Sequence, residues 1–494
     1  MKNFFKILFQ IIIIIKFSFQ LENPYKKYFE NIPFNMPEIK APFFQNYSIN
    51  IKDFGAIGDG KTLCTSYFSK AINFLSEKGG GKLIIPAGIY FTGPIELKSN
   101  INLHLEYGAI IQFSEDENLY PIIKTSYEGL DQYRCQSPLS ALNATNISIT
   151  GNGAIDGNGH FWRGVYKSRL TDSQWKEVEK RKNGKILSGT YWVPSEGYAI
   201  AEEKSRNNIP LSENNDIEEL NFYKRFLRPV MISLRNCTNI LLQGITFQNS
   251  PAWNLHPLMC ENIIIDNIFV KNPSYAINGD AIDLESCKNA LIINSIFDAG
   301  DDGICIKSGK DKDGRKRRKP CENVIIDGCT VFSGHGGFVV GSEMSGDVRN
   351  IKVSNCQFLG TDNGLRFKST RGRGGVVENI YIENISMKNI INDAITFNLY
   401  YFSSAKQIFD EDYQKLNIVT NMKVDETTPI FRNIYIKDII CDGANRAMEF
   451  TGLPEMPIDG IFLKNINIIA KNDAVFTDAK NIIKENVNIT INKN

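Results

Sequence analysis

Short alternations of apolar and polar residues recur along most of the chain, and each one starts at Asn and ends at Asn, Asp or Gly. Clear copies begin near residues 238, 261, 288, 322, 349, 378 and 432, and most successive copies start 23 to 34 residues apart. Strands of period two that end at such corners, at this spacing, are typical of a solenoid whose coils stack as parallel β-sheet. The pattern therefore predicts an all-β chain folded as a right-handed parallel β-helix.

Two long regions depart from the clear repeat. Residues 55–114 predict one amphipathic helix followed by short strands, and a helix at that point would cover the open end of the solenoid. Residues 160–228 are rich in charged and aromatic residues and predict a long insertion that projects from one coil. We expect residues 48–494 to form a single β-helix domain with this insertion, after an N-terminal extension at residues 21–47.

The first twenty residues have the pattern of a secretory signal peptide. Lys2 and Lys6 precede an apolar run, residues 7–15, which has the length of a signal-peptide core and is too short to span a bilayer. An uncleaved membrane anchor is the alternative, because Lys16 interrupts the segment and small residues for a cleavage site are scarce. We predict a secreted, extracellular protein. Sequons at Asn46, Asn143, Asn146, Asn236, Asn384 and Asn488 permit glycosylation, although several coincide with repeat corners.

Composition limits the partners of such a chain. The 494 residues are 42% hydrophobic and 22% charged with a net charge of +1, which describes a globular protein with a large core. A net charge this close to zero supplies no long-range attraction for nucleic acid. We expect no nucleic-acid partner, no membrane partner and a monomer; any polyanion would have to be held by local clusters of Lys and Arg. The basic run at residues 309–320 is either a solvated loop or the rim of such a site.

Several of the ten cysteines fall at one position of the repeat. Aligning the copies puts four cysteines two residues before the repeat Asn: Cys237, Cys260, Cys287 and Cys321. Stacked coils are about 4.8 Å apart, within reach of disulfide geometry, so the column is either two disulfides or a stack of buried thiols. We favour thiols, because small apolar groups stack well in a solenoid core. Cys329 and Cys356 form a second pair of this kind.

Register also gathers acidic residues on one outward face. The stretch 278–287 aligns with 300–309, 334–343 and 361–370, which places one apolar column inward: Ile282, Ile304, Phe338 and Leu365. Asp280 then shares a column with Asp302, and Asp301 shares a column with His335. Like charges placed side by side do not stabilise a sheet, so such pairs are expected where chemistry needs carboxyls with different pKa values.

Cations and aromatic residues join this face in neighbouring coils. They are Arg366, Lys368 and Lys307 on one side and Trp253 and His256 on the other. Taken alone, the Asp301–Asp302 pair between Gly300 and Gly303 is more often a surface turn than a site. The convergence of three aspartates, one histidine and three cations on four coils favours catalysis. We expect no metal and no cofactor.

These residues resemble the four motifs of the polygalacturonases, glycoside hydrolase family 28. The motifs are Asn278-Gly-Asp280, Gly300-Asp-Asp302, Gly334-His-Gly336 and Arg366-Phe-Lys368, in order along nearly the whole mature chain. Gly279 stands where Thr is common in the family, and Phe367 stands where Ile is common. The stretches 337–351 and 364–380 look like the exo-acting branch of the family.

The resemblance implies a role for each residue. Asp301 would be the general acid, and Asp280 with Asp302 would hold and activate the attacking water. His335 would tune the protonation of Asp301, and Arg366 and Lys368 would bind the galacturonate carboxylate of an acidic polysaccharide. We expect Asn278, Lys307, Trp253 and His256 to complete the substrate site. The family inverts anomeric configuration.

Three alternatives remain at the level of sequence. The enzyme could hydrolyse a decorated pectin, either rhamnogalacturonan or xylogalacturonan, although Arg366 and Lys368 favour an acidic sugar at the cleaved unit. A pectate lyase would share the fold but would need calcium. A non-catalytic carbohydrate-binding β-helix would have a broken acid or base column, and here both columns are intact.

Overall fold

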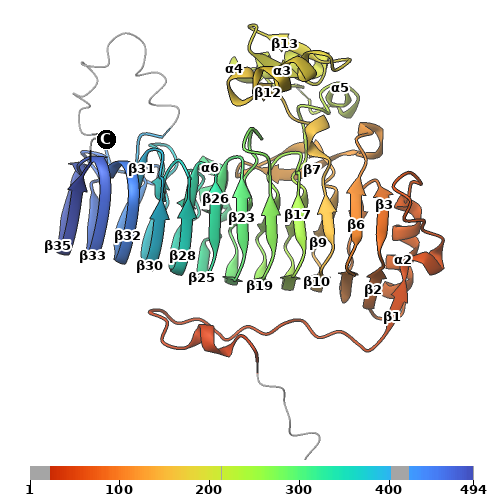
Figure 1. The fold of residues 1–494 in the computed structure, drawn as a ribbon, viewed down its shortest axis with the longest axis horizontal. Coiled ribbons are helices and arrows are strands. Elements are labelled where there is room, and N and C mark those ends of the chain that lie inside the picture. Colours follow the sequence, from red (N-terminus) through yellow and green to blue (C-terminus); the bar gives the residue numbers. More distant parts are fainter. Residues whose placement is uncertain (1–22, 213, 402–421, 493–494) are drawn as a thin grey trace, which may run out of the picture.

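A computed structural model of the chain describes residues 23–212, 214–401 and 422–492. Its main body is a right-handed parallel β-helix whose coils follow one another along the long axis of the molecule (Figure 1). This confirms the predicted fold class. The expected signal peptide, residues 1–20, lies outside the described residues.

Each coil contributes strands to three parallel stacks. The first stack contains β1 (Ser48–Asn50), β2 (Gly81–Ile85), β5 (Ile101–Leu105), β10 (Thr145–Gly151), β16 (Thr238–Gln243), β19 (Glu261–Asp266), β22 (Lys288–Ile293), β25 (Cys321–Asp327), β28 (Val348–Leu359), β30 (Val376–Lys388), β32 (Ile430–Thr451), β33 (Ile458–Asn472) and β35 (Ala479–Ile491). The second contains β3 (Gly88–Thr92), β6 (Ala109–Phe113), β11 (Ala154–Asp156), β17 (Thr246–Gln248), β20 (Phe269–Lys271), β23 (Ile296–Ala299) and β26 (Thr330–Ser333), and it continues into β28.

The third stack bears the acidic face. It contains β4 (Ile95–Glu96), β9 (Leu139–Leu142), β15 (Ile232–Arg235), β18 (Leu255–Leu258), β21 (Ile282–Glu285), β24 (Asp302–Lys307), β27 (Gly336–Val340), β29 (Leu365–Lys368) and β31 (Asp393–Asn398), followed by the end of β32 and by β34 (Val475–Thr477). Ile282 pairs with Ile304, Ile304 with Phe338, and Phe338 with Leu365. All four are at most 1% exposed, so the predicted inward column is confirmed.

The repeat Asn has two structural tasks at the corner of each coil. Asn239, Asn262, Asn289 and Asn323 all have a positive φ of 57–59°, a conformation that Asn tolerates better than most residues. Their side-chain amides also form a ladder, in which Asn262 donates to Asn239 at 3.1 Å and Asn289 donates to Asn262 at 3.2 Å. The corner therefore fixes both the turn and the stacking of adjacent coils.

The predicted cysteine column is present as free thiols. Cys237, Cys260, Cys287 and Cys321 lie in adjacent coils, all are buried, and all are reduced. The backbone N–H of Cys237 donates to the sulfur of Cys260, and that of Cys260 donates to the sulfur of Cys287, both at 3.4 Å. Burial raises the pKa of the Cys260 thiol well above its ordinary value. The column thus packs as a small apolar stack.

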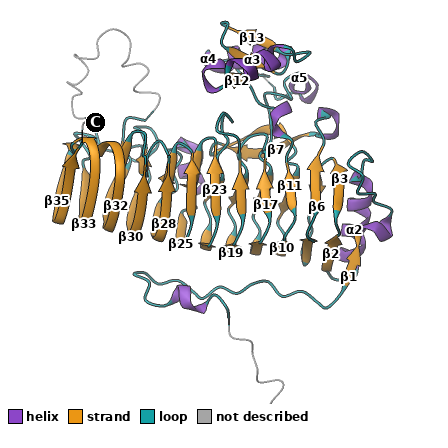
Figure 2. Ribbon diagram, in the orientation of Figure 1, coloured by secondary structure: helices purple, strands orange, loops and turns teal. Residues whose placement is uncertain are grey.

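One end of the solenoid is covered by the expected helix, α2 (Thr65–Glu77), seen at the N-terminal end in Figure 2. Phe68, Ala71, Ile72 and Leu75 form its buried face. The N-terminal extension runs back along the first strand stack (Figure 1). There Tyr25, Met36 and Ile39 pack against outward apolar residues of the first stack: Leu241, Ile264, Leu291, Ile293 and Ile325.

Two additions stand above the acidic face. One is an antiparallel hairpin, β7 (Ile122–Tyr127) and β8 (Leu130–Cys135). The other spans the predicted insertion and contains α3 (Asp172–Glu179), α4 (Glu196–Arg206), α5 (Ile217–Asn221) and a small sheet of β12 (Val165–Tyr166), β14 (Tyr191–Val193) and β13 (Lys185–Leu187) (Figure 2). The basic run forms a short helix, α6 (Asp311–Arg317). Within the described ranges, every helix is too short or too polar to cross a membrane.

The reduced state of the cysteines gives a direct test. We expect iodoacetamide to label all ten thiols of the unfolded chain without added reductant, and to label few of them in the folded protein, because all ten are buried. Intact mass spectrometry counts the labels. Fewer than ten labels in denaturant, restored to ten by a reductant, would show that some of these cysteines are paired.

Candidate active site

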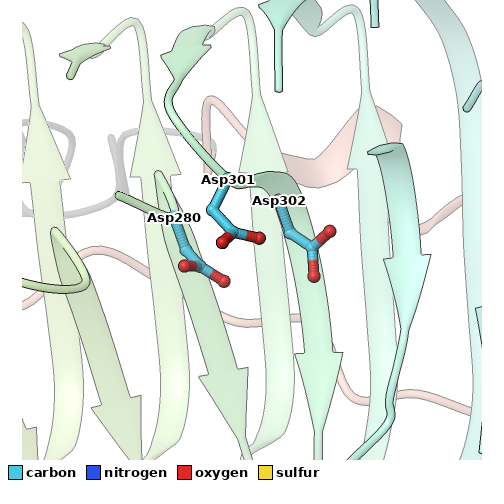
Figure 3. A group of neighbouring side chains, drawn as sticks. All are labelled: Asp280, Asp301 and Asp302. Carbon is cyan, nitrogen blue, oxygen red and sulfur yellow. The ribbon is translucent and has the colours of Figure 1, made fainter. Parts of the chain in front are cut away.

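The three aspartates meet at the start of two adjacent strands of the third stack. Asp280 lies just before β21, and Asp301 and Asp302 stand at the start of β24. One carboxylate oxygen from each lies within 4.8 Å of the others, and Figure 3 shows the three side chains grouped on one face. They line a pocket of about 280 Å³. The register that placed Asp280 beside Asp302 is confirmed by the pairing of Ile282 with Ile304.

The glycines around the aspartate pair serve close packing. Neither Gly300 nor Gly303 has a left-handed φ. A Cβ at Gly300 would approach the Pro273 carbonyl oxygen to 2.4 Å, and a Cβ at Gly303 would approach a methyl group of Val331 to 2.5 Å. These two glycines therefore leave room for the neighbouring coils, because a side chain at either position would collide with them.

Asp302 is held in its ionised form by two cations. It is 1% exposed, and its two oxygens accept from Arg366 Nη1 at 3.2 Å and from Lys368 Nζ at 2.6 Å. Burial alone would raise its pKa, but Lys368, Arg366 and Lys307 outweigh burial and lower the pKa of Asp302 below its usual range. The expected substrate cations thus neutralise a carboxylate of the site itself.

Asp280 has the opposite protonation preference. It is 3% exposed, and burial together with the nearby charges of Asp283, Asp301 and Asp302 raises its pKa well above the ordinary value. One of its oxygens, Oδ1, has no hydrogen-bond partner. Two carboxyls one coil apart are therefore separated into a protonated group and an ionised group, as crowding predicts.

Asp301 is the accessible carboxyl of the three. Its side chain is 22% exposed, and its Oδ1 lies 3.0 Å from Nδ1 of His335. The backbone N–H of His335 also donates to the carbonyl of Asp301 at 2.8 Å, as the shared column predicts. The hydrogen bond to Asp301 raises the pKa of His335 in spite of burial.

The other expected substrate residues fall into two groups. Asn278 and Trp253 line the pocket, and the side-chain oxygen of Asn278 accepts from Arg228 at 2.7 Å. Lys307 also borders the pocket but is 4% exposed, lies 4.7 Å from the Trp253 ring centroid and bonds to Glu343 at 2.7 Å. Asn278, Trp253 and Lys307 thus all line the pocket, and Lys307 with Trp253 forms one packed part of its wall.

The expectation that His256 faces the substrate is wrong. His256 is fully buried, and its Nε2 lies 2.8 Å from Oε2 of Glu285, which is also fully buried and pairs with Arg317. Its position is taken up by the pairing with Glu285 of the next coil, which Arg317 of α6 also binds. His256 is part of an internal charge network below the pocket.

Several residues near the site were missed at the level of sequence. Arg169 of the insertion reaches His335 Nε2 at 3.3 Å, and Tyr401 packs against Lys368 at 4.9 Å from its ring centroid. Asp283 is fully buried 3.5 Å from Lys307. Alternation around Ile282 could have placed Asp283 outward. No local pattern connects Arg169 or Tyr401 to this site, because both come from segments outside the repeat.

The three aspartates are also the cluster with metal-ligand spacing within the described part of the chain. The set fits a divalent cation poorly. Asp302 is already neutralised by Arg366 and Lys368, and Asp280 favours its protonated form. A bound cation would have to displace two charged side chains and a proton.

Comparison with known proteins agrees with this geometry. The model of Glycosyl hydrolases family 28 matches residues 221–481, which is more than half of the chain. A probable polygalacturonase from Vitis vinifera is 29% identical over 87% of this chain and 76% of its own length. An exo-poly-alpha-D-galacturonosidase from Dickeya chrysanthemi is 28% identical over 82% of this chain, which spans only 64% of that relative.

A solved structure is similar over almost the whole length of both chains. It is a hyperthermoactive exopolygalacturonase from Thermotoga maritima, with a TM-score of 0.72 and 32% identity, covering 90% of this chain and 94% of that one. Polygalacturonase from Erwinia carotovora shares the fold, with a TM-score of 0.61 at 22% identity. The resemblance stated from the four motifs is confirmed. The chain belongs to glycosyl hydrolases family 28 and is a glycoside hydrolase.

Proposed function

We propose that this hydrolase cleaves the α-1,4-galacturonosidic bonds of polygalacturonan, the acidic backbone of pectin, and that it acts from chain ends. The observation that carries the proposal is one pocket lined by three crowded carboxyls and Lys368, with Arg366 bonded to Asp302 beside it. Arg and Lys together suit a uronate carboxylate. Similarity to proteins named polygalacturonase, one of them exo-acting, supports the same substrate.

In this proposal Asp301 is the general acid. It is the most exposed of the three carboxyls, so it is the one that a glycosidic oxygen in the pocket can approach. His335 holds it at 3.0 Å and fixes its orientation. Proton donation to the leaving oxygen leaves Asp301 as a carboxylate. Because the pKa of His335 is raised, its imidazole takes up a proton more readily, and the positive charge then stabilises that carboxylate.

Asp302 and Asp280 would share the attacking water. Asp302 is ionised and supplies the base, while the protonated Asp280 can donate a hydrogen bond to the same water. A uronate carboxylate that binds Arg366 and Lys368 competes with Asp302 for them. The ion pairs of Arg366 and Lys368 with Asp302 are then weakened. This raises the pKa of Asp302 and makes it a stronger base when an acidic sugar is present.

Inversion rests on the resemblance to the family. The closest oxygens of the three carboxyls lie within 4.8 Å, whereas carboxyls of inverting glycosidases are usually about 6.5 to 9.5 Å apart. The 4.8 Å limit joins the nearest oxygen atoms of the three side chains and is not the separation of the acid from the base, so it does not select between inversion and retention. The anomer first released, followed by proton NMR, distinguishes the two outcomes.

Exo action is supported by a second pocket at one end of the site. This pocket, about 300 Å³, adjoins the catalytic pocket through Glu128 and Asn278. Its walls come from hairpin β7–β8 and from the insertion, which contributes Tyr166, Tyr191, Tyr198, Glu202, Ser205 and Phe226. A pocket of this size has room for a short chain end. In this proposal the insertion closes the groove at that end.

We also propose that the enzyme is secreted. The apolar segment at residues 7–15 has the length of a signal-peptide core. A pectin hydrolase meets its substrate in the cell wall, outside the cell that makes it.

Replacement of the general acid should abolish most activity. We expect Asp301→Asn to fold normally and to lose hydrolysis of polygalacturonan by about 10²-fold or more, the usual scale for a positioned acid. Asp442→Asn, an exposed carboxylate on β32, is the matched control and should retain activity. Near-wild-type rates for a folded Asp301→Asn enzyme would exclude Asp301 from the chemistry.

The two cations should discriminate between acidic and esterified substrates. We expect Arg366→Ala and Lys368→Ala to reduce kcat/KM more on free-acid galacturonan than on methyl-esterified chains, because the ester has no charge to pair. Initial rates on both polymers measure the ratio. An equal loss of kcat/KM on both polymers would indicate that these side chains only keep Asp302 ionised and do not bind the sugar carboxylate.

Hydrolysis should not depend on a divalent cation. We expect dialysis against EDTA to leave activity unchanged, because the carboxyls are already compensated by Arg366, Lys368 and a proton. Loss of activity that calcium restores, with unsaturated products absorbing in the ultraviolet, would instead indicate a lyase.

Opening the closed end should change the products. We expect replacement of residues 165–209 by a short Gly-Ser linker to shift products of polygalacturonan from monomer or dimer toward mixed oligomers, because solenoid coils depend chiefly on their neighbours. The double variant Tyr191→Ala and Tyr198→Ala widens the same pocket in an otherwise intact chain. Chromatography of early products provides the measurement, and an unchanged profile in active variants would place the wall elsewhere.

A further inference from the structure

Arg169 connects the insertion with the acid side of the active site. It is the last residue of a short helical turn, η5 (Lys167–Arg169), and it is exposed. Its Nη1 donates to the carbonyl oxygen of Ser274 at 3.2 Å, and its Nη2 lies 3.3 Å from Nε2 of His335. A carbonyl oxygen and a ring nitrogen carry no full negative charge. These two contacts therefore leave the positive charge of Arg169 beside the imidazole.

The contact with Arg169 determines which nitrogen of His335 carries a hydrogen. A guanidinium group has donors only, so Nε2 of His335 accepts from it. The hydrogen of the neutral ring is then on Nδ1, which lies 3.0 Å from Oδ1 of Asp301 and donates to it. Because Oδ1 accepts this hydrogen bond, the acidic proton of Asp301 belongs on Oδ2. Arg169 thus favours one arrangement of hydrogens across the Asp301–His335 pair.

The other charges around His335 favour a different arrangement. The charged groups that face this residue are Asp301, Asp302, Asp362, Arg366 and Arg169. The hydrogen bond to Asp301 and the charges of these aspartates raise the pKa of His335. Arg366 Nη1 donates to the backbone carbonyl of His335 at 3.3 Å and pairs with Asp302. Arg169 lies closer to Nε2 than Asp362 does, at 3.3 Å against 3.9 Å, and opposes proton uptake there.

We propose that Arg169 is a positioning residue of the hydrolysis: it holds His335 as the neutral tautomer with hydrogen on Nδ1, and so keeps the proton of the pair on Asp301. The inference rests on the proposed function, in which Asp301 is the general acid. If the same proton moved to Nε2, the pair would become an imidazolium and a carboxylate. The number of protons would be unchanged, but Asp301 would have none to give to the leaving oxygen.

This role would give the insertion a second effect on the reaction. In the proposed function the insertion closes the groove, and through Arg169 it also sets the protonation of the acid. Replacement of residues 165–209 by a linker removes Arg169, so that variant should lose rate as well as change its products. The Tyr191→Ala and Tyr198→Ala variant keeps Arg169 and should lose less.

Nitrogen NMR of the imidazole rings tests the tautomer directly. The chain has four histidines, so isotope-labelled histidine gives few signals, and His335→Gln assigns the signal of His335. In the wild type we expect the neutral ring to carry hydrogen on Nδ1. In Arg169→Met the ring should take up its second proton about one pH unit higher, because the opposing cation is gone. Lys176→Met removes the same charge from the exposed side of α3 and should titrate as the wild type does.

The pH profile of kcat/KM on polygalacturonan separates this role from a structural one. Arg169→Met should lose about 10-fold at pH values where its His335 is charged and that of the wild type is neutral. At higher pH both rings are neutral, so the two rates should converge. Arg169→Lys keeps a charged donor and should recover part of the loss.

Three results would overturn the inference. They are a neutral wild-type ring with hydrogen on Nε2, an unchanged titration of His335 in Arg169→Met, and a loss of kcat/KM that is equal at all pH values. Failure of the proposed function would look different. The wild type would then not hydrolyse polygalacturonan, whereas the hydrogen on Nδ1 and its dependence on Arg169 would still be visible by NMR.

Discussion

The parallel register of the coils places residues of the same kind about one strand spacing apart. The protonation states of the site depend on how the repulsion between its stacked carboxyls is relieved. Asp280 and Asp302 occupy one column, and Asp301 stands beside them. In an ordinary sheet this arrangement would be destabilising. Here burial and two cations resolve it, since Asp280 retains a proton and Asp302 keeps its charge.

In the proposed function, the same cations connect the ionisation of Asp302 with substrate binding. Arg366 and Lys368 neutralise Asp302, and in the proposed function they border the positions that an acidic sugar would occupy. A uronate would thus replace an internal partner rather than meet an unpaired cation. This exchange links recognition of the carboxylate with the strength of the base. It also explains why buried cations lie so close to the reacting centre, where their desolvation would otherwise be costly.

The sequence predicted the parts of the molecule that repeat. The inward column from Ile282 to Leu365, the cysteine stack and the capping helix all follow from periodicity, because each coil repeats the contacts of its neighbour. Residues whose positions depend on segments outside the repeat were missed or misplaced. His256 was expected to face the substrate, but it is fully buried and pairs with Glu285, which also binds Arg317 of α6. Arg169 reaches His335 from the insertion, which no periodic signal positions.

The central claim is that Lys368 and Arg366 keep Asp302 ionised as the base. Its most direct test is the acid limb of kcat/KM against pH, measured for wild type and for Lys368→Met on the same polygalacturonan. Because its pKa is lowered, Asp302 stays ionised at pH values well below the ordinary pKa of an aspartate. The acid limb of the wild type should therefore lie at low pH. Removal of Lys368 should move that limb upward by about one pH unit or more. A limb at the same pH in both enzymes would contradict the account.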